Sequence, residues 1–379
     1  MSHRFTGILV LAVLLAGCGD DSGISISTTG VPTTTATTTT TATSTTDDVA
    51  DDAGWIVDLL ARIPDTADSA SLVTLADLAG AARAAGVAVP SPGASPDEVT
   101  AYVLALPRDA LLPELLQRTA SDVGSLRAEL GFDHAVVEAA VGAGEPPEQF
   151  LVLKGAFDAG SADAAVHSDP VWSDLLVTQE HAGVAYYAWG ADLEIDVERV
   201  TPARPLGRGG RLALDDGYLY WVPWTAGLDS LIDAAAGAVP TLADGAPLRQ
   251  AAEVLQRERV YAAMLTDVPL VAGPGLSGAL APYLVLGLGG GRDDAGPFWV
   301  VVVIHDTAAA AEQSAAGFRS AIAEGMALGV NAPWSERVTG MEVTVEDAAM
   351  MAVLHSAVPE GDWMHALYTR DPLLAVAGG

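Results

Sequence analysis

The chain has 379 residues, half of them hydrophobic, which is enough for a sizeable core. Its 49 acidic residues against 18 Lys and Arg give a formal net charge of −31. Such a surface repels phosphate backbones, which argues against nucleic acid as a partner. Cys18 is the one cysteine, so no disulfide can form within the chain and the core alone must hold the fold.

The first residues have the features of an exported leader. Arg4 gives a positive charge, and residues 5–16 form an apolar run shorter than the ~20 residues that span a bilayer. The run ends in Leu15-Ala16-Gly17-Cys18, which resembles a bacterial lipobox. The resemblance implies a signal peptide over residues 1–17 and lipidation of Cys18, with acyl chains such as palmitate that hold the chain to the membrane. The alternative is a cytosolic protein with an apolar N-terminus and a free thiol.

Residues 18–52 are expected to form a disordered tether. From Thr33 to Thr46, 11 of the 14 residues are threonine, and such a run has no apolar surface to bury. Fully extended, residues 19–52 would reach ~110 Å, and as a random coil about 30 Å. The tether is either a glycosylated stalk or a bare spacer, and the composition leaves both open.

Residues 53–147 are expected to form a mostly helical region. Apolar spacing and capping signals mark its helices, such as the capping box Ser95-Pro96-Asp97-Glu98 and the caps Asp77 and Gly86. Helices are predicted at 55–63, 78–85, 96–106, 111–117, 121–130 and 134–141, and a strand at 69–76.

Strand signals dominate the remainder, which divides into a first α+β unit, 148–270, and a second, 271–379. In the first unit the sequence predicts strands at 150–157, 182–189 and 259–265, a hairpin at 211–222, and helices after Asp158, at 228–235 and at 248–256. In the second it predicts a hairpin of 283–288 with 298–304 across a Gly-rich turn, a hairpin at 338–356, and helices at 308–323 and 363–374.

A faint internal repeat connects the two units. Phe150 to Asp158 and Phe298 to Asp306 are both strands that begin with an aromatic residue and end in an Asp before an Ala-rich helix. Each is followed by a hairpin with an acidic turn. We therefore expect an α+β fold of antiparallel hairpins packed with Ala-rich helices, built from two β-α-β-β units, although capping alone would also produce strand–Asp–helix.

Several short runs resemble uncharacterised extracytoplasmic lipoproteins of actinobacterial type. They are Leu130-Gly131-Phe132-Asp133, Gly144-Glu145-Pro146-Pro147, Lys154-Gly155-Ala156-Phe157-Asp158, Tyr186-Tyr187-Ala188-Trp189 and Asp371-Pro372-Leu373-Leu374-Ala375. The resemblance covers most of the chain from Ile63 onward, but its motifs are turns, caps and strand ends. It implies no established activity, substrate or catalytic residue.

Motifs that carry chemistry are weak. The histidines show no zinc-type spacing, and His305-Asp306 would point to opposite faces of a strand. The run 275–279 departs from the nucleophile elbow, and the Gly-rich run 287–291 lacks the Lys-Ser/Thr ending of a phosphate loop. No cofactor is indicated. Paired carboxylates leave no signature in a sequence, so a hydrolase remains open.

Aromatic residues give the most specific candidate site. Tyr187 with Trp189 share one face of a predicted strand, Tyr218 with Tyr220 share a face of another, and Trp221 and Trp224 follow. Neighbouring strands would bring these rings into a stacking platform for cell-wall carbohydrate. The competing interpretation is that they fill the core between sheet and helices.

These observations favour a membrane-anchored extracytoplasmic lipoprotein that is not an enzyme and that binds or supports an envelope component. Its expected partners are the membrane, through the lipid on Cys18, and a cell-wall carbohydrate or envelope protein. The alternatives are an envelope hydrolase that uses paired carboxylates and a solute-binding component of a transporter. The latter would show two doubly wound lobes, which the predicted hairpins do not favour.

Overall fold

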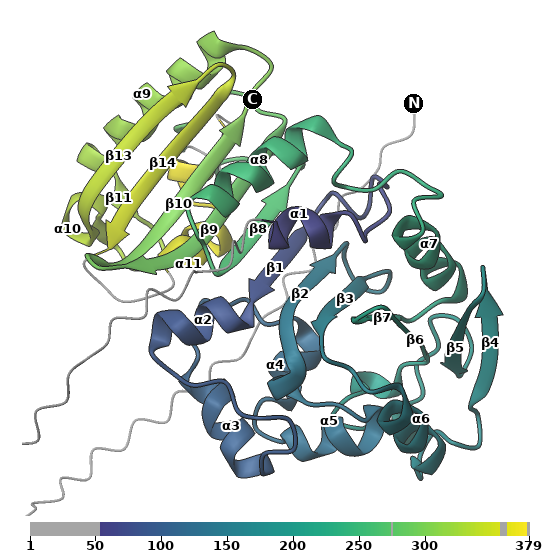
Figure 1. Cartoon of the computed structure of the whole chain (residues 1–379). Coiled ribbons are helices and arrows are strands. Elements are labelled where there is room, and N and C mark those ends of the chain that lie inside the picture. Colours follow the sequence, from purple (N-terminus) through teal and green to yellow (C-terminus); the bar gives the residue numbers. More distant parts are fainter. Residues whose placement is uncertain (1–53, 274–275, 357–361, 377–379) are drawn as a thin grey trace, which may run out of the picture. The chain divides into compact units, whose positions relative to one another are not determined.

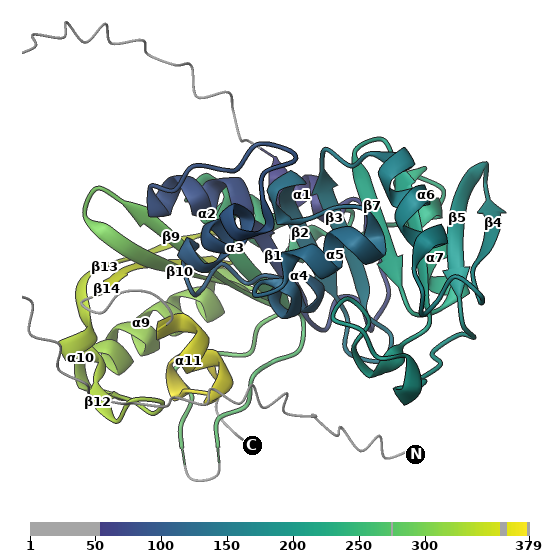
Figure 2. The ribbon, with the colours of Figure 1, turned by 90° about the horizontal axis from the view of Figure 1, so that it is seen from below.

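Within residues 54–273, 276–356 and 362–376, which this computed structural model describes, twelve strands form one antiparallel sheet. Its strand order is β13-β14-β10-β9-β8-β1-β2-β3-β7-β6-β5-β4, and Figure 2 shows it running from β13 on the left to β4 on the right. The predicted α+β class is confirmed. The leader, Cys18 and the tether lie outside the described residues.

The strands and helices have the following bounds. The large sheet contains β1 (Val73–Asp77), β2 (Val137–Ala143), β3 (Phe150–Gly155), β4 (Val177–His181), β5 (Val184–Trp189), β6 (Gly210–Asp215), β7 (Tyr218–Val222), β8 (Ala262–Thr266), β9 (Val285–Asp293), β10 (Gly296–Ile304), β13 (Val338–Glu346) and β14 (Ala349–Ser356). A small second sheet pairs β11 (Met326–Ala327) with β12 (Ala332–Pro333). The α-helices are α1 (Trp55–Leu60), α2 (Leu78–Ala85), α3 (Pro96–Ala105), α4 (Glu114–Thr119), α5 (Val123–Leu130), α6 (Ala159–Ser168), α7 (Thr225–Ala235), α8 (Ala246–Arg257), α9 (Ala308–Glu324), α10 (Trp334–Arg337) and α11 (Asp362–Tyr368).

Helices cover both faces of the large sheet. The first face packs against α1, α7 and α8, of which α1 and α8 lie in front of the sheet in Figure 1. The second face packs against α2 to α6, α9 and α11. Residues on one strand alternate between the faces: Val300 and Val302 face α8, whereas Val301 and Val303 face α9.

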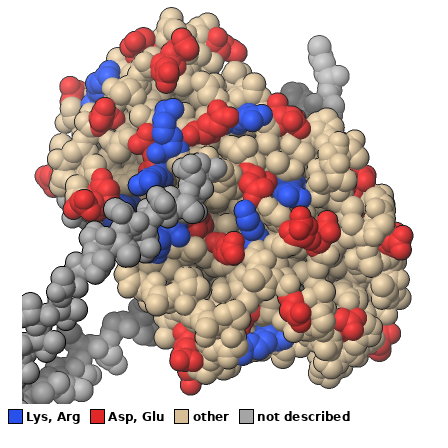
Figure 3. Space-filling model, viewed as in Figure 1, with Lys and Arg blue, Asp and Glu red and all other residues tan. Residues whose placement is uncertain are grey.

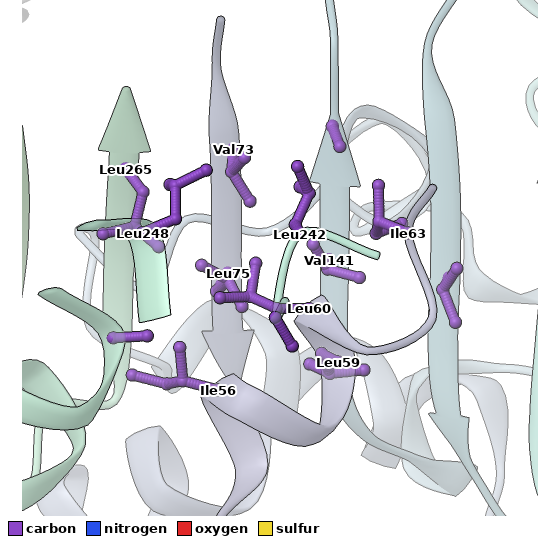
Figure 4. Packing of buried hydrophobic residues seen from close by; sticks show 14 of the residues in the cluster. Ile56, Leu59, Leu60, Ile63, Val73, Leu75, Val141, Leu242, Leu248 and Leu265 are labelled. Carbon is purple, nitrogen blue, oxygen red and sulfur yellow. The ribbon is translucent and has the colours of Figure 1, made fainter. Parts of the chain in front are cut away.

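Helix α1 is fixed to the middle of the first face. Its apolar side chains Ile56, Leu59 and Leu60 are fully buried, and they contact a layer of sheet residues (Figure 4). Leu75 and Leu265, from β1 and β8, belong to the same cluster. The first described helix is therefore part of the core.

The sheet order reveals a two-fold repeat. The first half runs α1-β1-β2-β3-α6-β6-β7 and the second runs α8-β8-β9-β10-α9-β13-β14, and each half pairs its strands in the same way. The halves join where β1 pairs antiparallel with β8, Val73 opposite Leu265. In this repeat β3 is equivalent to β10, and the hairpin β6–β7 is equivalent to the hairpin β13–β14. The sequence suggested the same correspondence. In this topology the first half begins with α1 and β1, and the second begins with α8.

Several predicted elements match the structure closely. Helix α2 has the predicted bounds, and the Asp77 carboxylate accepts a hydrogen bond from the Gly80 N–H at its N-terminus. Ser95 and Glu98 form the predicted capping box of α3. Both acidic hairpin turns are present, between β6 and β7 and between β13 and β14.

Other predicted elements are wrong. The helix predicted at 134–141 is a short 3₁₀ turn followed by β2, because this Ala-rich strand is buried on both faces and so lacks the alternating pattern. The Gly-rich run 287–291 is part of β9, not the turn, which lies at 293–296. Helix α9 is capped by Thr307, not Asp306. The closing helix ends at Tyr368 and only a 3₁₀ turn follows, and β4 was not predicted.

The glycines of β9 allow neighbouring side chains to approach its backbone. A Cβ at Gly289 would lie 2.7 Å from a methyl carbon of Val260. A Cβ at Gly291 would lie 2.3 Å from the Phe298 ring. The run is therefore glycine-rich because of close packing, and it gives no support to a phosphate loop.

Candidate functional site

The five aromatic residues proposed as a ligand platform are divided between the two faces of the sheet. Tyr187 and Trp189 lie on the face covered by α6. Tyr218, Tyr220 and Trp224 lie on the opposite face. The two groups of rings are therefore separated by the sheet, and one platform made of all five rings does not form.

Tyr218 belongs to a polar cluster that joins α1 to the sheet. Its hydroxyl donates a hydrogen bond to Asp58 Oδ2 over 2.7 Å, and Lys154 Nζ donates to the same oxygen over 2.9 Å. The Arg62 guanidinium carbon lies 4.1 Å from the centroid of the Tyr218 ring. Burial, and then the bond to Asp58, raise the pKa of Tyr218. These contacts fix α1 to β3 and β7, which is a structural role for Tyr218.

Tyr220 and Trp224 pack in the core of the first face. Tyr220 is 1% exposed, and burial raises the pKa of its hydroxyl to about 12. The Trp224 ring lies 5.0 Å from the Phe150 ring, centroid to centroid. Trp224 immediately precedes α7, is partly buried and packs against the core of the first face. The core interpretation describes both residues.

Trp189 lies in a buried ionic cluster on the second face. The Arg204 guanidinium carbon lies 4.7 Å from the Trp189 ring centroid. Arg204 Nη1 donates to Asp169 Oδ2 and, over 3.0 Å, to Glu129 Oε2. Burial raises the pKa of Glu129, although hydrogen bonds from Thr201 and the charge of Arg204 oppose the shift. These charged residues form no recognisable motif in the sequence, because Asp169 and Glu129 lie 35 and 75 positions from Arg204.

Tyr187 is the predicted site residue that borders a hollow. A cleft of about 290 Å³ lies between the β4–β5 hairpin and the end of β6. Its lining includes Tyr187, Tyr186, Thr178, Val184, Leu214 and Asp215. The cleft is large enough to hold a small ligand or part of a larger one.

The cleft exists because β5 separates from β6. The two strands pair from Trp189 opposite Gly210 to Tyr186 opposite Ala213, and the pairing stops there. Ala185 continues to pair with β4, and Leu214 continues to pair with β7, but the two do not pair with each other. The cleft therefore lies beyond the point where the ladder between β5 and β6 ends.

Polar side chains lie at the same place. The Tyr187 hydroxyl donates to Asp163 Oδ1 over 2.8 Å, and the Tyr187 ring meets His167 edge-on with centroids 5.9 Å apart. Burial and the bond to Asp163 raise the pKa of Tyr187 to about 12, so the hydroxyl stays protonated. Thr178 and Asp215 add a hydroxyl and a carboxylate to the lining. The lining therefore combines an aromatic ring with a hydroxyl and a carboxylate.

The other motifs considered from the sequence do not assemble into a reactive site. His305 is buried and its Nδ1 donates to the Pro282 carbonyl over 2.8 Å, and burial lowers the pKa of its imidazole. Gly275, in the run compared with a nucleophile elbow, lies outside the described residues. Among the described residues, no group of three or more His, Cys, Asp or Glu side chains is placed to hold a metal ion.

Comparisons with known proteins yield little. No protein-family model matches the chain, and no curated protein matches it. Crystal forms I and III of a protein called TP0453 align with 9% identity and a TM-score of 0.40, covering 84% of this chain and 98% and 97% of theirs. We draw no functional conclusion from so low a similarity. In the described part of the chain, none of the helices has the length and apolar character needed to cross a membrane.

Proposed function

We propose that the chain is an extracytoplasmic lipoprotein, anchored to the membrane through acyl chains on Cys18, that binds carbohydrate of the cell envelope in the cleft beside Tyr187. The cleft is the observation that carries the binding function. The lipobox-like run Leu15-Ala16-Gly17-Cys18 supports the anchor, and the charge of −31 is compatible with an uncharged or basic ligand.

The geometry favours binding over catalysis. A glycosidase needs two carboxyl groups at a fixed separation around the scissile bond. In the cleft, Asp215 is a lining residue, while Asp163 is engaged by the Tyr187 hydroxyl and is not itself part of the lining. The wholly antiparallel sheet also differs from the doubly wound lobes expected of a transporter-associated binding protein.

Carbohydrate binding is tested with purified cell-wall glycan fragments and the full mature protein, by calorimetry. We expect Tyr187→Ala to weaken binding about tenfold, since the loss of one stacking contact of about 1.4 kcal/mol corresponds to that ratio. Tyr368→Ala is the matched control, because Tyr368 is a tyrosine that is 69% exposed and does not line the cleft. Equal affinities of both variants and the parent protein would refute the site.

The anchor is tested separately. The protein produced in a lipoprotein-processing bacterium should have the mass of residues 18–379 plus a diacylglyceryl group, and should fractionate with membranes. Cys18→Ser should abolish the acylation and the cleavage at residue 17. An unmodified product of the full 379-residue mass would contradict the proposal.

A further inference from the structure

The segment between β5 and β6 exposes apolar side chains in an unusual pattern. Leu193, Ile195, Val197 and Val200 are 36%, 56%, 72% and 53% exposed. The first three alternate with acidic residues along the chain, and Val200 follows Arg199. Segments at a protein surface normally turn apolar side chains inward. In this segment the direction is reversed, so a row of aliphatic groups faces outward.

Three acidic residues of the same segment accept hydrogen bonds, Asp192 from the body and Glu194 and Asp196 from the segment itself. Asp192 Oδ1 accepts hydrogen bonds from the N–H and hydroxyl of Thr225, over 2.9 and 2.8 Å, and lies 2.7 Å from Arg211 Nη2. Glu194 accepts from the Ala191 N–H. Asp196 accepts from the Glu198 N–H over 3.0 Å. Asp192 and Glu198 are exposed beside the aliphatic row, although the carboxylate of Asp192 is paired with Arg211.

Specific contacts hold the segment in this position. Arg204 anchors its second half in the buried cluster with Asp169 and Glu129. Arg199 forms a two-pronged bond to Asp174, over 2.6 and 2.9 Å. Leu193 adopts a φ of 58°, in the left-handed region that residues other than glycine rarely occupy. A segment fixed in this way presents its apolar row without first having to become ordered.

We propose that this row, Leu193 to Val200, inserts into the surface of the lipid bilayer to which Cys18 tethers the chain, and so orients the body on the membrane. The inference rests on the proposed anchor. An acylated Cys18 would be 34 residues from the start of the body, a length that spans at most ~110 Å, so the anchor would keep the body near the bilayer. Intramolecular attachment raises the effective concentration of lipid at the row, which makes weak insertion sufficient.

Charge determines which lipids are favoured. The body is strongly acidic, and an anionic membrane would repel it within about a Debye length. Residues 192–200 carry four acids and one arginine, so the segment is not a basic patch of the kind that recognises anionic headgroups. We therefore expect insertion into zwitterionic phosphatidylcholine vesicles, and weaker insertion when phosphatidylglycerol is added at low salt.

The experiment uses the lipidated mature protein in vesicles, with one introduced cysteine labelled by an environment-sensitive dye. An acylated Cys18 is blocked, so Val197→Cys provides the single reactive thiol. Val271→Cys is the matched control, since Val271 is a valine that is 50% exposed on a loop of the second half. With nitroxide-bearing phosphatidylcholine, we expect the dye at 197 to be quenched at least threefold more than the dye at 271. Adding Ile195→Ser should reduce the quenching at 197.

Each outcome decides the proposal. Equal quenching at 197 and 271, or none at 197, would overturn it. A dye shift at 197 that depends on protein concentration and occurs without vesicles would show that a second copy covers the row, and would also overturn it. A failed anchor is recognised independently. An unacylated Cys18 would react with a second dye molecule, and the mass of the protein would lack the diacylglyceryl group.

Discussion

Arg204 lies over Trp189 inside the protein, with its guanidinium carbon 4.7 Å from the ring centroid, and its Nη1 donates hydrogen bonds to the carboxylates of Glu129 and Asp169. The arginine is 1% exposed, and one of the two carboxylates, Asp169, is 2% exposed. The cluster links three segments that are distant in sequence, at positions 129, 169 and 204. The stability of these three segments relative to one another therefore depends on the buried Arg204 keeping its two carboxylate partners.

Removing Arg204 should be severely destabilising. In Arg204→Ala, Asp169 and Glu129 keep their burial and lose their cation, and such a loss typically costs about 3–5 kcal/mol. Urea denaturation measures the change in the free energy of unfolding. The control is Arg249→Ala, which breaks the exposed pair with Glu253 and should cost less than about 1 kcal/mol. Similar midpoints for the two variants would show that the buried cluster contributes no more than a surface pair.

Two helix-ending glycines that look alike in sequence should respond differently to alanine. Gly86 and Gly131 end α2 and α5 with φ of 68° and 77°. A Cβ at Gly86 meets nothing within 4 Å, whereas one at Gly131 would lie 2.4 Å from the Ser161 carbonyl oxygen. Gly86→Ala should cost only the left-handed penalty of about 1–2 kcal/mol. Gly131→Ala should cost clearly more, because the backbone of α6 must shift, and thermal unfolding of both variants checks the order.

Stability should fall as the pH decreases below neutral because of His134. The imidazole is fully buried, its Nε2 donates to the Leu116 carbonyl over 2.8 Å, and burial lowers its pKa below the usual 6.5. Above pH ~6.5 neither state binds the proton, and below it the unfolded chain is protonated first, so stability is lost as the pH falls. Each unit of lowering corresponds to about 1.4 kcal/mol.

Urea midpoints between pH 7.5 and 5 measure this dependence. It should be reduced in His134→Gln and retained in the control His167→Gln, which removes a half-exposed imidazole. If the His134 variant keeps the full dependence of the parent protein, another group is responsible.

The hydrogen bond from Tyr218 to Asp58 should stabilise the packing of α1 against the sheet. Tyr218→Phe removes one hydrogen bond at 2.7 Å to a charged acceptor and should cost about 1–2 kcal/mol. A double-mutant cycle with Asp58→Ala should give a coupling of similar size. Tyr368→Phe, at an exposed position, should change the free energy of unfolding by less than about 0.5 kcal/mol.

Local signals allowed much of the fold to be predicted from sequence. Caps such as Asp77 and the Ser95 capping box act within a few residues, so their helices were predicted correctly. The predictions of a helix at 134–141 and of a turn at 287–291 were wrong for the opposite reason. The conformation of these segments is decided by close contacts with distant elements, such as Val260 against Gly289.

The candidate site was less predictable. Tyr187 was among the aromatic residues singled out, but nothing local indicates that β5 leaves β6 after Tyr186 to open the cleft. The Arg204 cluster has no signal in sequence either, because its partners meet only after folding. The alternation of acidic and aliphatic residues from Asp192 to Glu198 was available in the sequence. Which set faces outward was not.

The pairing of β1 with β8 makes the two halves parts of one sheet. A molecule containing one half alone would end its sheet at an unpaired strand, because β1 and β8 each supply the other's backbone partners. The β4–β5 hairpin, which lies between α6 and β6 in the chain, extends the large sheet beyond β6 and forms a wall of the cleft. At the corresponding place in the second half, between α9 and β13, the short β11–β12 hairpin forms a sheet of its own, so β13 is an edge of the large sheet.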